Sequence, residues 1–247
     1  MRRYEKLDTF RGMMVLSMVL YHGVWDVVYL FGKDVSWYGG WQGRLWQQSI
    51  CWSFIFLSGF CCTFGKSKWK NGVRLMLSGG AVTLVTLLVM PQYPVIFGIL
   101  TFLGMASCLV KVLEPWLRRW ASLPASIGSF LLFLVLGRIN EGYVGWRFLG
   151  SFALPKGLYR DWITALIGFP FPGFASSDYF SLFPWIFLYA AGFFSCCWMK
   201  EKKERMYRLE RGSLPWISWM GRHSLLLYML HQPLLYGCLS IVFVLLS

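Results

Sequence analysis

Residues 7–26 read LDTFRGMMVLSMVLYHGVWD, an apolar run that carries a histidine and an aspartate. A helix needs about 20 predominantly apolar residues to cross a bilayer, because each residue advances about 1.5 Å along the axis. Ionisable side chains are costly in hydrocarbon and are usually functional where they occur. The stretch therefore predicts a first membrane span whose polar side chains serve a purpose.

The composition extends this prediction to the whole chain. Of its 247 residues, 57% are hydrophobic and 14% are charged, whereas soluble domains carry about 25% charged residues. No polar stretch is long enough to build a second core, so we predict a single domain over residues 1–247. The predicted fold is an all-α, polytopic integral membrane helix bundle of about seven transmembrane helices. The spans are expected near residues 12–31, 46–64, 73–90, 93–110, 121–137, 180–199 and 223–246.

The net charge of +13 is explained by topology. With an odd number of spans and a cytoplasmic N-terminus, 18 Lys and Arg residues fall in cytoplasmic loops and helix ends, against six outside. The positive-inside rule therefore supports this orientation, and the charge needs no nucleic-acid partner. The first apolar run is too long for a cleavable signal peptide.

Residues 138–179 interrupt the helical pattern on the predicted outer side. Pro170 and Pro172 end an apolar run that is too short to cross a bilayer. We expect residues 162–169 to form a half-helix that re-enters the membrane or lies along its surface. This segment is a candidate lid.

The first span carries a polar stripe. At about 100° per residue, Asp8, Arg11, His22 and Asp26 fall within an arc of about 120°, and His22 lies about 16 Å beyond Arg11. Histidine suits proton transfer near neutrality, and Asp26, one turn further on, could orient its ring. In the alternative reading, Asp8 and Arg11 form an interfacial pair and His22 only bonds a neighbouring helix.

Two further sites are candidates for contact with a substrate. Tyr228 and His231 share a face of the last span, where His231 could line the same cavity as His22 or simply bond another helix. Asp178 stands at the outer entrance to the sixth span, next to aromatic residues typical of a membrane interface. The chain has three histidines and no C-x-x-C, H-E-x-x-H, P-loop or G-x-S-x-G pattern, so the sequence predicts no metal site.

Several stretches resemble one known family. The stretches LDTFRGMMVLSMVLYH, FIFLSGF, FGILTFLGMAS, SSDYFSLFPWIFLYAAG and GRHSLLLYMLHQP are similar to bacterial membrane proteins grouped with the catalytic domain of heparan-alpha-glucosaminide N-acetyltransferase. The spacing Arg11-x10-His22 also resembles the arginine-histidine motif of a wider transmembrane acyltransferase superfamily. The resemblance implies a location in the bacterial cytoplasmic membrane.

The resemblance implies transfer of an acyl group, most simply acetyl, from cytosolic acyl-CoA to a hydroxyl or amine of an extracytoplasmic sugar or small acceptor. Acetyl-CoA or another acyl-CoA would be the cosubstrate, held through its phosphates near Arg11, Arg74 and Arg222. His22 would either take a proton from the acceptor or carry the acyl group itself. We place Asp26 and Asp8 with His22 in the catalytic set, and Asp178, Tyr228 and His231 on the acceptor side.

Two positions differ from the family pattern. Thr101 stands where many relatives have a histidine. The family's eukaryotic enzyme has its proposed catalytic histidine in the loop after the first span, whereas here Asp34 is the nearest polar residue. The loop at residues 32–45 is therefore an alternative location for the chemistry.

Other functions remain open on the sequence alone. Seven spans with intramembrane charges also suit a transporter or flippase that uses His22 and Asp26 as a proton relay. A non-catalytic scaffold is a third hypothesis. Small residues in FLSGF and MLSGGAVTL allow close helix packing within one protomer or between the two protomers of a homodimer.

Overall fold

The computed structural model describes residues 4–65, 68–146, 150–210 and 214–245. It divides the chain into a first unit, Met1–Phe54 with Lys202–Ser247, and a second unit, Ile55–Glu201, with the boundary inside one long helix. Five residues counted above for orientation lie outside the described residues: Arg2, Arg3, Lys66, Arg147 and Arg211.

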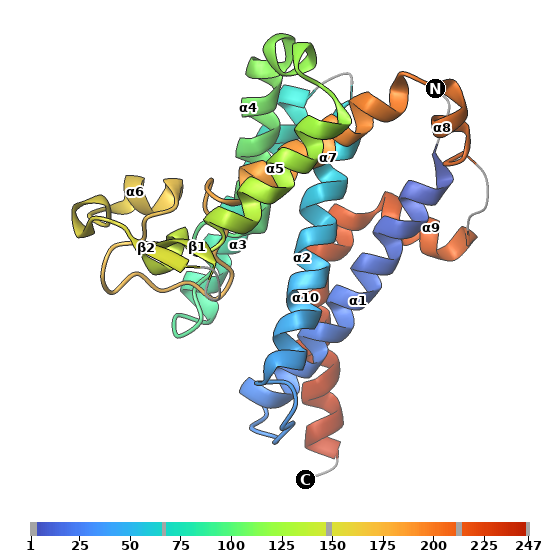
Figure 1. Cartoon of the computed structure of the whole chain (residues 1–247). Helices are drawn as coiled ribbons and strands as arrows, with labels where there is room; N and C mark the ends of the chain where they lie inside the picture. Colours follow the sequence, from blue (N-terminus) through green and yellow to red (C-terminus); the bar gives the residue numbers. More distant parts are fainter. Residues whose placement is uncertain (1–3, 66–67, 147–149, 211–213, 246–247) are drawn as a thin grey trace. The chain divides into compact units, whose positions relative to one another are not determined.

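The first unit is built on two long helices, α1 and α10, with a short helix, α9, across the start of α1 (Figure 1). Residues 41–54 of helix α2 also belong to this unit. The helices of the first unit are α1 (Glu5–Tyr29), α2 (Trp41–Cys62), α8 (Lys203–Tyr207), α9 (Pro215–Arg222) and α10 (Ser224–Leu245).

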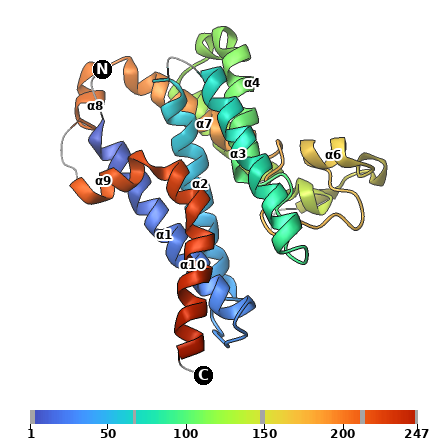
Figure 2. The ribbon, with the colours of Figure 1, turned by 180° about the vertical axis from the view of Figure 1, so that it is seen from behind.

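Helices α1 and α10 run side by side in the same direction, as both views show (Figures 1 and 2). Near its middle α1 contacts α10 through His22 and His231, whose ring centroids lie 4.8 Å apart. Just beyond the end of α1, Phe31 stacks on Phe243 at 4.4 Å. Residues later in α1, and just after it, therefore contact residues later in α10, as expected for parallel helices.

Helix α9 packs against α1 through small residues. A Cβ at Gly12 would overlap the carbonyl oxygen of Ile217, and a Cβ at Gly221 would overlap that of Asp8. Between these contacts the buried hydroxyls of Thr9 and Ser218 form a hydrogen bond of 2.7 Å. Glycine therefore lets the two backbones meet at this crossing, as small residues do in membrane helix pairs.

The second unit consists of paired helices and a small irregular region. Helix α3 packs on α4, and α5 packs on α7. The Ser126 hydroxyl of α5 donates a hydrogen bond of 2.8 Å to the carbonyl of Ala191 on α7. The elements of this unit after α2 are α3 (Lys68–Val89), α4 (Ile99–Arg119), α5 (Leu123–Leu136), η1 (Ile139–Glu141), β1 (Tyr143–Trp146), β2 (Gly150–Ala153), η2 (Lys156–Leu158), α6 (Trp162–Ile167) and α7 (Trp185–Lys200).

The predicted all-α class needs one correction. Strands β1 and β2 form an antiparallel hairpin within residues 138–179, the segment predicted to be a candidate lid, with Tyr143 opposite Ala153 and Trp146 opposite Gly150. Gly145 has φ +110° and Gly150 has φ +114°, conformations that favour glycine. The half-helix expected at residues 162–169 is present as α6, which Asp161 begins with a capping box to Thr164.

The predicted count of seven spans is not confirmed. Within the described residues, five helices are long and apolar enough to cross a membrane: α1, α3, α4, α5 with the residues that follow it, and α10. Helix α7 has 16 residues, fewer than the roughly 20 that a crossing needs. Helix α2 has 22 residues, but its glutamines, including Gln47 and Gln48, lower its hydropathy.

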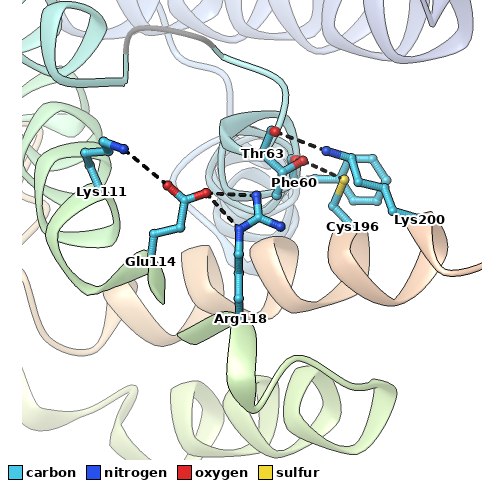
Figure 3. Close-up of polar contacts among 7 residues, drawn as sticks. All are labelled: Phe60, Thr63, Lys111, Glu114, Arg118, Cys196 and Lys200. Carbon is cyan, nitrogen blue, oxygen red and sulfur yellow. Dashed lines mark hydrogen bonds and ion pairs between the residues drawn. The ribbon is translucent and has the colours of Figure 1, made fainter. Parts of the chain in front are cut away.

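Helix α4 is shifted along the chain from the predicted span at 93–110. It begins only at Ile99, because Gly98 is extended; Pro94 also disfavours the helical conformation of Tyr93, where the predicted span started. It continues past residue 110 because Glu114 pairs with Lys111 at 3.7 Å and with Arg118 at 2.8 Å (Figure 3). Such pairs at three- and four-residue spacing stabilise a helix outside hydrocarbon.

The ends of α2 and α7 are joined by a second group of polar contacts (Figure 3). The Thr63 hydroxyl and the Cys196 thiol lie 2.9 Å apart, and the Lys200 ammonium donates a hydrogen bond of 3.0 Å to the Thr63 carbonyl. Lys200 also lies over the ring of Phe64, 4.1 Å from its centroid. Lys200 thus satisfies a carbonyl just past the end of α2, where the helix leaves carbonyls unpaired.

Candidate functional site

The centre of the first unit holds two histidines in ring contact. His22 lies on α1 and His231 on α10, with 62° between their ring planes. His231 is buried and His22 is half-buried. The parallel course of the two helices therefore brings together histidines that are 209 positions apart in the sequence.

Asp26 is fully buried beside these histidines. Its Oδ1 accepts a hydrogen bond from the side-chain amide Nε2 of Gln232 on α10. Asp26 makes no hydrogen bond to His22, so the base-and-orienter pair expected from their four-residue spacing is not formed. The amide on the facing helix bonds Oδ1 instead, and Oδ2 has no hydrogen-bond partner among the described residues.

Gln232 is the residue of this cluster that the sequence analysis missed. Its position directly after His231, with an amide inside an otherwise apolar span, is the signal that could have found it. Gln232 is rotated by about 100° from His231 around the helix axis, so it lies off the face that Tyr228 and His231 share.

His231 is held by the backbone of its own helix. Its Nδ1 lies 2.6 Å from the carbonyl oxygen of Tyr228, three residues earlier. The rings of Tyr228 and His231 also lie close, with centroids 5.5 Å apart. Tyr228 therefore touches His231 with both its backbone and its side chain.

Three buried polar atoms of this cluster have no hydrogen-bond partner among the described residues. They are Asp26 Oδ2, His231 Nε2 and Gln232 Oε1. Buried polar groups without a partner are rare and costly in proteins. Three on one pair of helices mark the α1–α10 cluster, which we define as His22, Asp26, His231 and Gln232, as a candidate functional site.

Aromatic residues border the cluster on the side of the α1–α2 loop. Tyr21 makes an edge contact with His22 at 5.7 Å, and Tyr38 donates a hydrogen bond of 3.2 Å to the carbonyl of Tyr21. Burial raises the pKa of the Tyr38 phenol well above its usual range, so this hydroxyl stays protonated and acts as a donor. Trp46 of α2 donates a hydrogen bond of 2.8 Å to the Ser17 hydroxyl of α1. These contacts fix the loop beside the cluster.

The predicted donor-binding residues Arg11 and Arg222 lie toward the N-terminal end of the same unit. Arg11 pairs with Asp8 at 3.5 Å. Gly221 packs on the backbone of Asp8, so its neighbour Arg222, which is exposed, stands at the same end. The third predicted donor contact, Arg74, is an exposed residue of α3 in the second unit.

Asp178 also belongs to the second unit, where it has a structural contact. Its Oδ2 accepts a hydrogen bond of 3.1 Å from the backbone nitrogen of Ile99, the first residue of α4. The neighbouring Ser176 hydroxyl accepts a hydrogen bond from the backbone nitrogen of Ile96 at 2.9 Å. Asp178 thus satisfies a backbone nitrogen at the start of α4, where a helix leaves its first nitrogens unpaired, and Ser176 satisfies one in the segment just before it.

The helices and this site together define a membrane protein with an ionisable cluster between two of its candidate spans. A comparison with protein families matches residues 3–233 to the family described as heparan-alpha-glucosaminide N-acetyltransferase, catalytic. The match includes every candidate site residue and nearly the whole chain, so the chain belongs to this family. Comparisons with curated proteins and with solved structures found no match.

Proposed function

We propose that this chain transfers an acetyl group from cytosolic acetyl-CoA to an amine or hydroxyl of a sugar or small acceptor across the membrane. Membership of the family implies acetyltransferase activity. The observation that carries the proposal is the α1–α10 cluster, because its buried ionisable groups lie between helices long enough to span a bilayer. Such groups are rare inside membranes unless they serve a function.

The donor would approach the end of the first unit that holds Arg11 and Arg222. A guanidinium is always charged and matches the geometry of a phosphate, so it suits the phosphates of CoA. Asp8 would then act by positioning Arg11, with which it pairs. Arg74 of the second unit is proposed separately as a phosphate contact, on the basis of its charge alone.

The acceptor would meet the thioester at the α1–α10 cluster, with His22 and Asp26 in the catalytic set and Tyr228 and His231 on the acceptor side. Asp178 of the second unit is proposed separately as an acceptor contact. Imidazole can take up and release a proton near neutrality, which attack on a thioester by an amine or hydroxyl requires. This arrangement also requires the N-terminus to face the cytoplasm, as the distribution of Lys and Arg suggests. The location we propose is the bacterial cytoplasmic membrane.

Binding of acetyl-CoA tests the donor side. Calorimetry on detergent-purified protein should show a complex with acetyl-CoA that Arg11→Ala weakens by about 10- to 100-fold, the equivalent of a charged hydrogen bond of about 1.5–3 kcal/mol. Arg44→Ala is the matched control, since it removes an exposed arginine at the start of α2 that we place in no binding role. Unchanged affinity in Arg11→Ala would remove this residue from the donor site, and no binding by the wild type would refute the donor itself.

A transporter that uses the cluster as a proton relay is the second candidate. It is favoured by the full burial of Asp26, because a buried carboxyl can hold and release a proton during transport. Substrate flux into proteoliposomes without release of CoA from acetyl-CoA would support this alternative against ours.

A further inference from the structure

The two histidines of the cluster differ in what their ring nitrogens can do. A carbonyl oxygen accepts hydrogen bonds and cannot donate them, so the 2.6 Å contact with Tyr228 requires the proton of neutral His231 to sit on Nδ1. The lone pair of the ring is then on Nε2. The backbone of α10 therefore sets the tautomer of His231.

The second ring nitrogen of His231, Nε2, is available to accept a hydrogen bond from a ligand. Nε2 is buried and has no hydrogen-bond partner among the described residues. A buried acceptor without a donor is costly, and a substrate that donates a proton there would remove the cost. The nitrogen opposite the Tyr228 bond thus has the lone pair, the burial and the fixed direction that a general base needs.

The ring of His22, unlike that of His231, is not oriented by a hydrogen bond among the described residues. None of the hydrogen bonds found among the described residues involves its ring, and the nearest carboxyl, Asp26, bonds Gln232 instead. Besides Tyr21, the His22 ring contacts the ring of His231, edge to face at 4.8 Å. Its packing against this ring limits the rotation of His231.

We infer that Nε2 of His231 is the base of the transfer and that His22 is a positioning residue that supports the His231 ring. This inference rests on the proposed acetyl transfer. The polar stripe of α1 makes His22 the candidate base on the sequence alone. The orientation of the His231 ring on α10 favours His231 instead.

Acetyl transfer with His231 as the base needs no reactant other than acetyl-CoA and the acceptor. The acceptor's nitrogen or oxygen uses its electron pair to form a bond to the acetyl carbonyl carbon, and its proton passes to Nε2 of His231. The carbon–sulfur bond of acetyl-CoA breaks, and the leaving thiolate takes the proton from Nε2. The products are the acetylated acceptor and free CoA, with His231 returned to its starting state.

Substitutions at three histidines test the assignment in the full chain. His231→Asn keeps an amide donor near the position of Nδ1 but has no atom at Nε2, and His231→Ala removes the ring. We expect both to lower acetyl transfer to glucosamine by about 10²- to 10⁴-fold, the usual contribution of a general base, while acetyl-CoA binding is kept. His223→Asn is the matched control, because His223 also bonds a backbone carbonyl through Nδ1, that of Trp219 at 2.9 Å, but is exposed.

Chemical rescue separates a base from a packing role. Added imidazole should restore transfer by His231→Ala several-fold and should not restore transfer by His22→Ala, since only the first lacks the proton acceptor. The inference is overturned if His231→Asn retains more than about a third of wild-type transfer, or if imidazole restores His22→Ala alone. A wild type without acetyl transfer would instead refute the proposed function itself.

Discussion

Asp26 shows why the cluster needs α10 as well as α1. A fully buried carboxyl with no donor would be very costly, and the amide of Gln232 supplies its hydrogen bond from the facing helix. The pair therefore joins the two helices at the level of the histidines. Its contribution to stability can be measured separately from catalysis.

Gln232→Leu should destabilise the protein by about 1–3 kcal/mol, because it leaves the Asp26 carboxyl buried without its donor. The double variant Asp26→Leu/Gln232→Leu should lose less than the sum of the two single changes, since neither side chain is left without the other. Thermal unfolding of the four proteins in one detergent gives the coupling energy. Additive losses would show that the two side chains do not interact.

Asp178 can be tested as a helix cap against its predicted contact with a substrate. Asp178→Asn keeps an oxygen for the Ile99 nitrogen and should leave stability nearly unchanged, whereas Asp178→Ala should cost about 0.5–2 kcal/mol. Thermal unfolding distinguishes the two variants. A large rise in the acceptor KM of Asp178→Asn at unchanged stability would show that the carboxylate also contacts substrate.

The sequence predicts the individual polar residues better than their partners. The period of the helix places Arg11, His22 and Asp26 on one face of α1, because that argument needs only rotation per residue. It cannot place His231 against His22 or Gln232 against Asp26, because those contacts depend on how α10 is rotated beside α1. The tautomer of His231 likewise depends on a backbone atom whose position only the folded helix gives.

The crossing of α9 and α1 depends on glycine. Gly12→Ala would place a methyl group on the carbonyl oxygen of Ile217, so the helices would have to separate. We expect a loss of about 1–3 kcal/mol in thermal unfolding, as for overpacked interiors. Gly237→Ala in α10 is the matched control, because a Cβ there meets no atom within 4 Å. A loss in Gly12→Ala no larger than in the control would contradict this packing.

Hydropathy along the sequence predicts the long helices but not every element of the fold. The long apolar runs were predicted to be helical, and α1, α3 and α10 are helices over most of the expected residues. The hairpin β1–β2 was not predicted, because its residues carry no regular alternation and its two strands include positive φ angles at Gly145 and Gly150. The extension of α4 to Arg119 comes from the side-chain ion pairs of Glu114, which an average over hydropathy ignores.

The parallel course of α1 and α10 predicts on which side of the membrane each end of the chain lies. Because α1 and α10 run in the same direction, the two ends of the chain should lie on opposite sides of the membrane, with the N-terminus in the cytoplasm. A C-terminal alkaline phosphatase fusion should be active and a C-terminal green fluorescent protein fusion dark, since each folds properly on only one side. Cytoplasmic location of both ends would contradict the parallel course of the two spans.

The central claim is that acetyl-CoA reacts at the α1–α10 cluster. The direct measurement is chromatographic detection of CoA and acetylated product from acetyl-CoA and glucosamine, with purified protein in lipid nanodiscs. The seven cysteines of the chain make thiol reagents unsuitable. We expect acetylated product with the wild type and with His223→Asn. In the double variant His22→Asn/His231→Asn, the rate of acetyl transfer should fall by about 10²-fold or more. Equal product from the folded double variant and the wild type would contradict it.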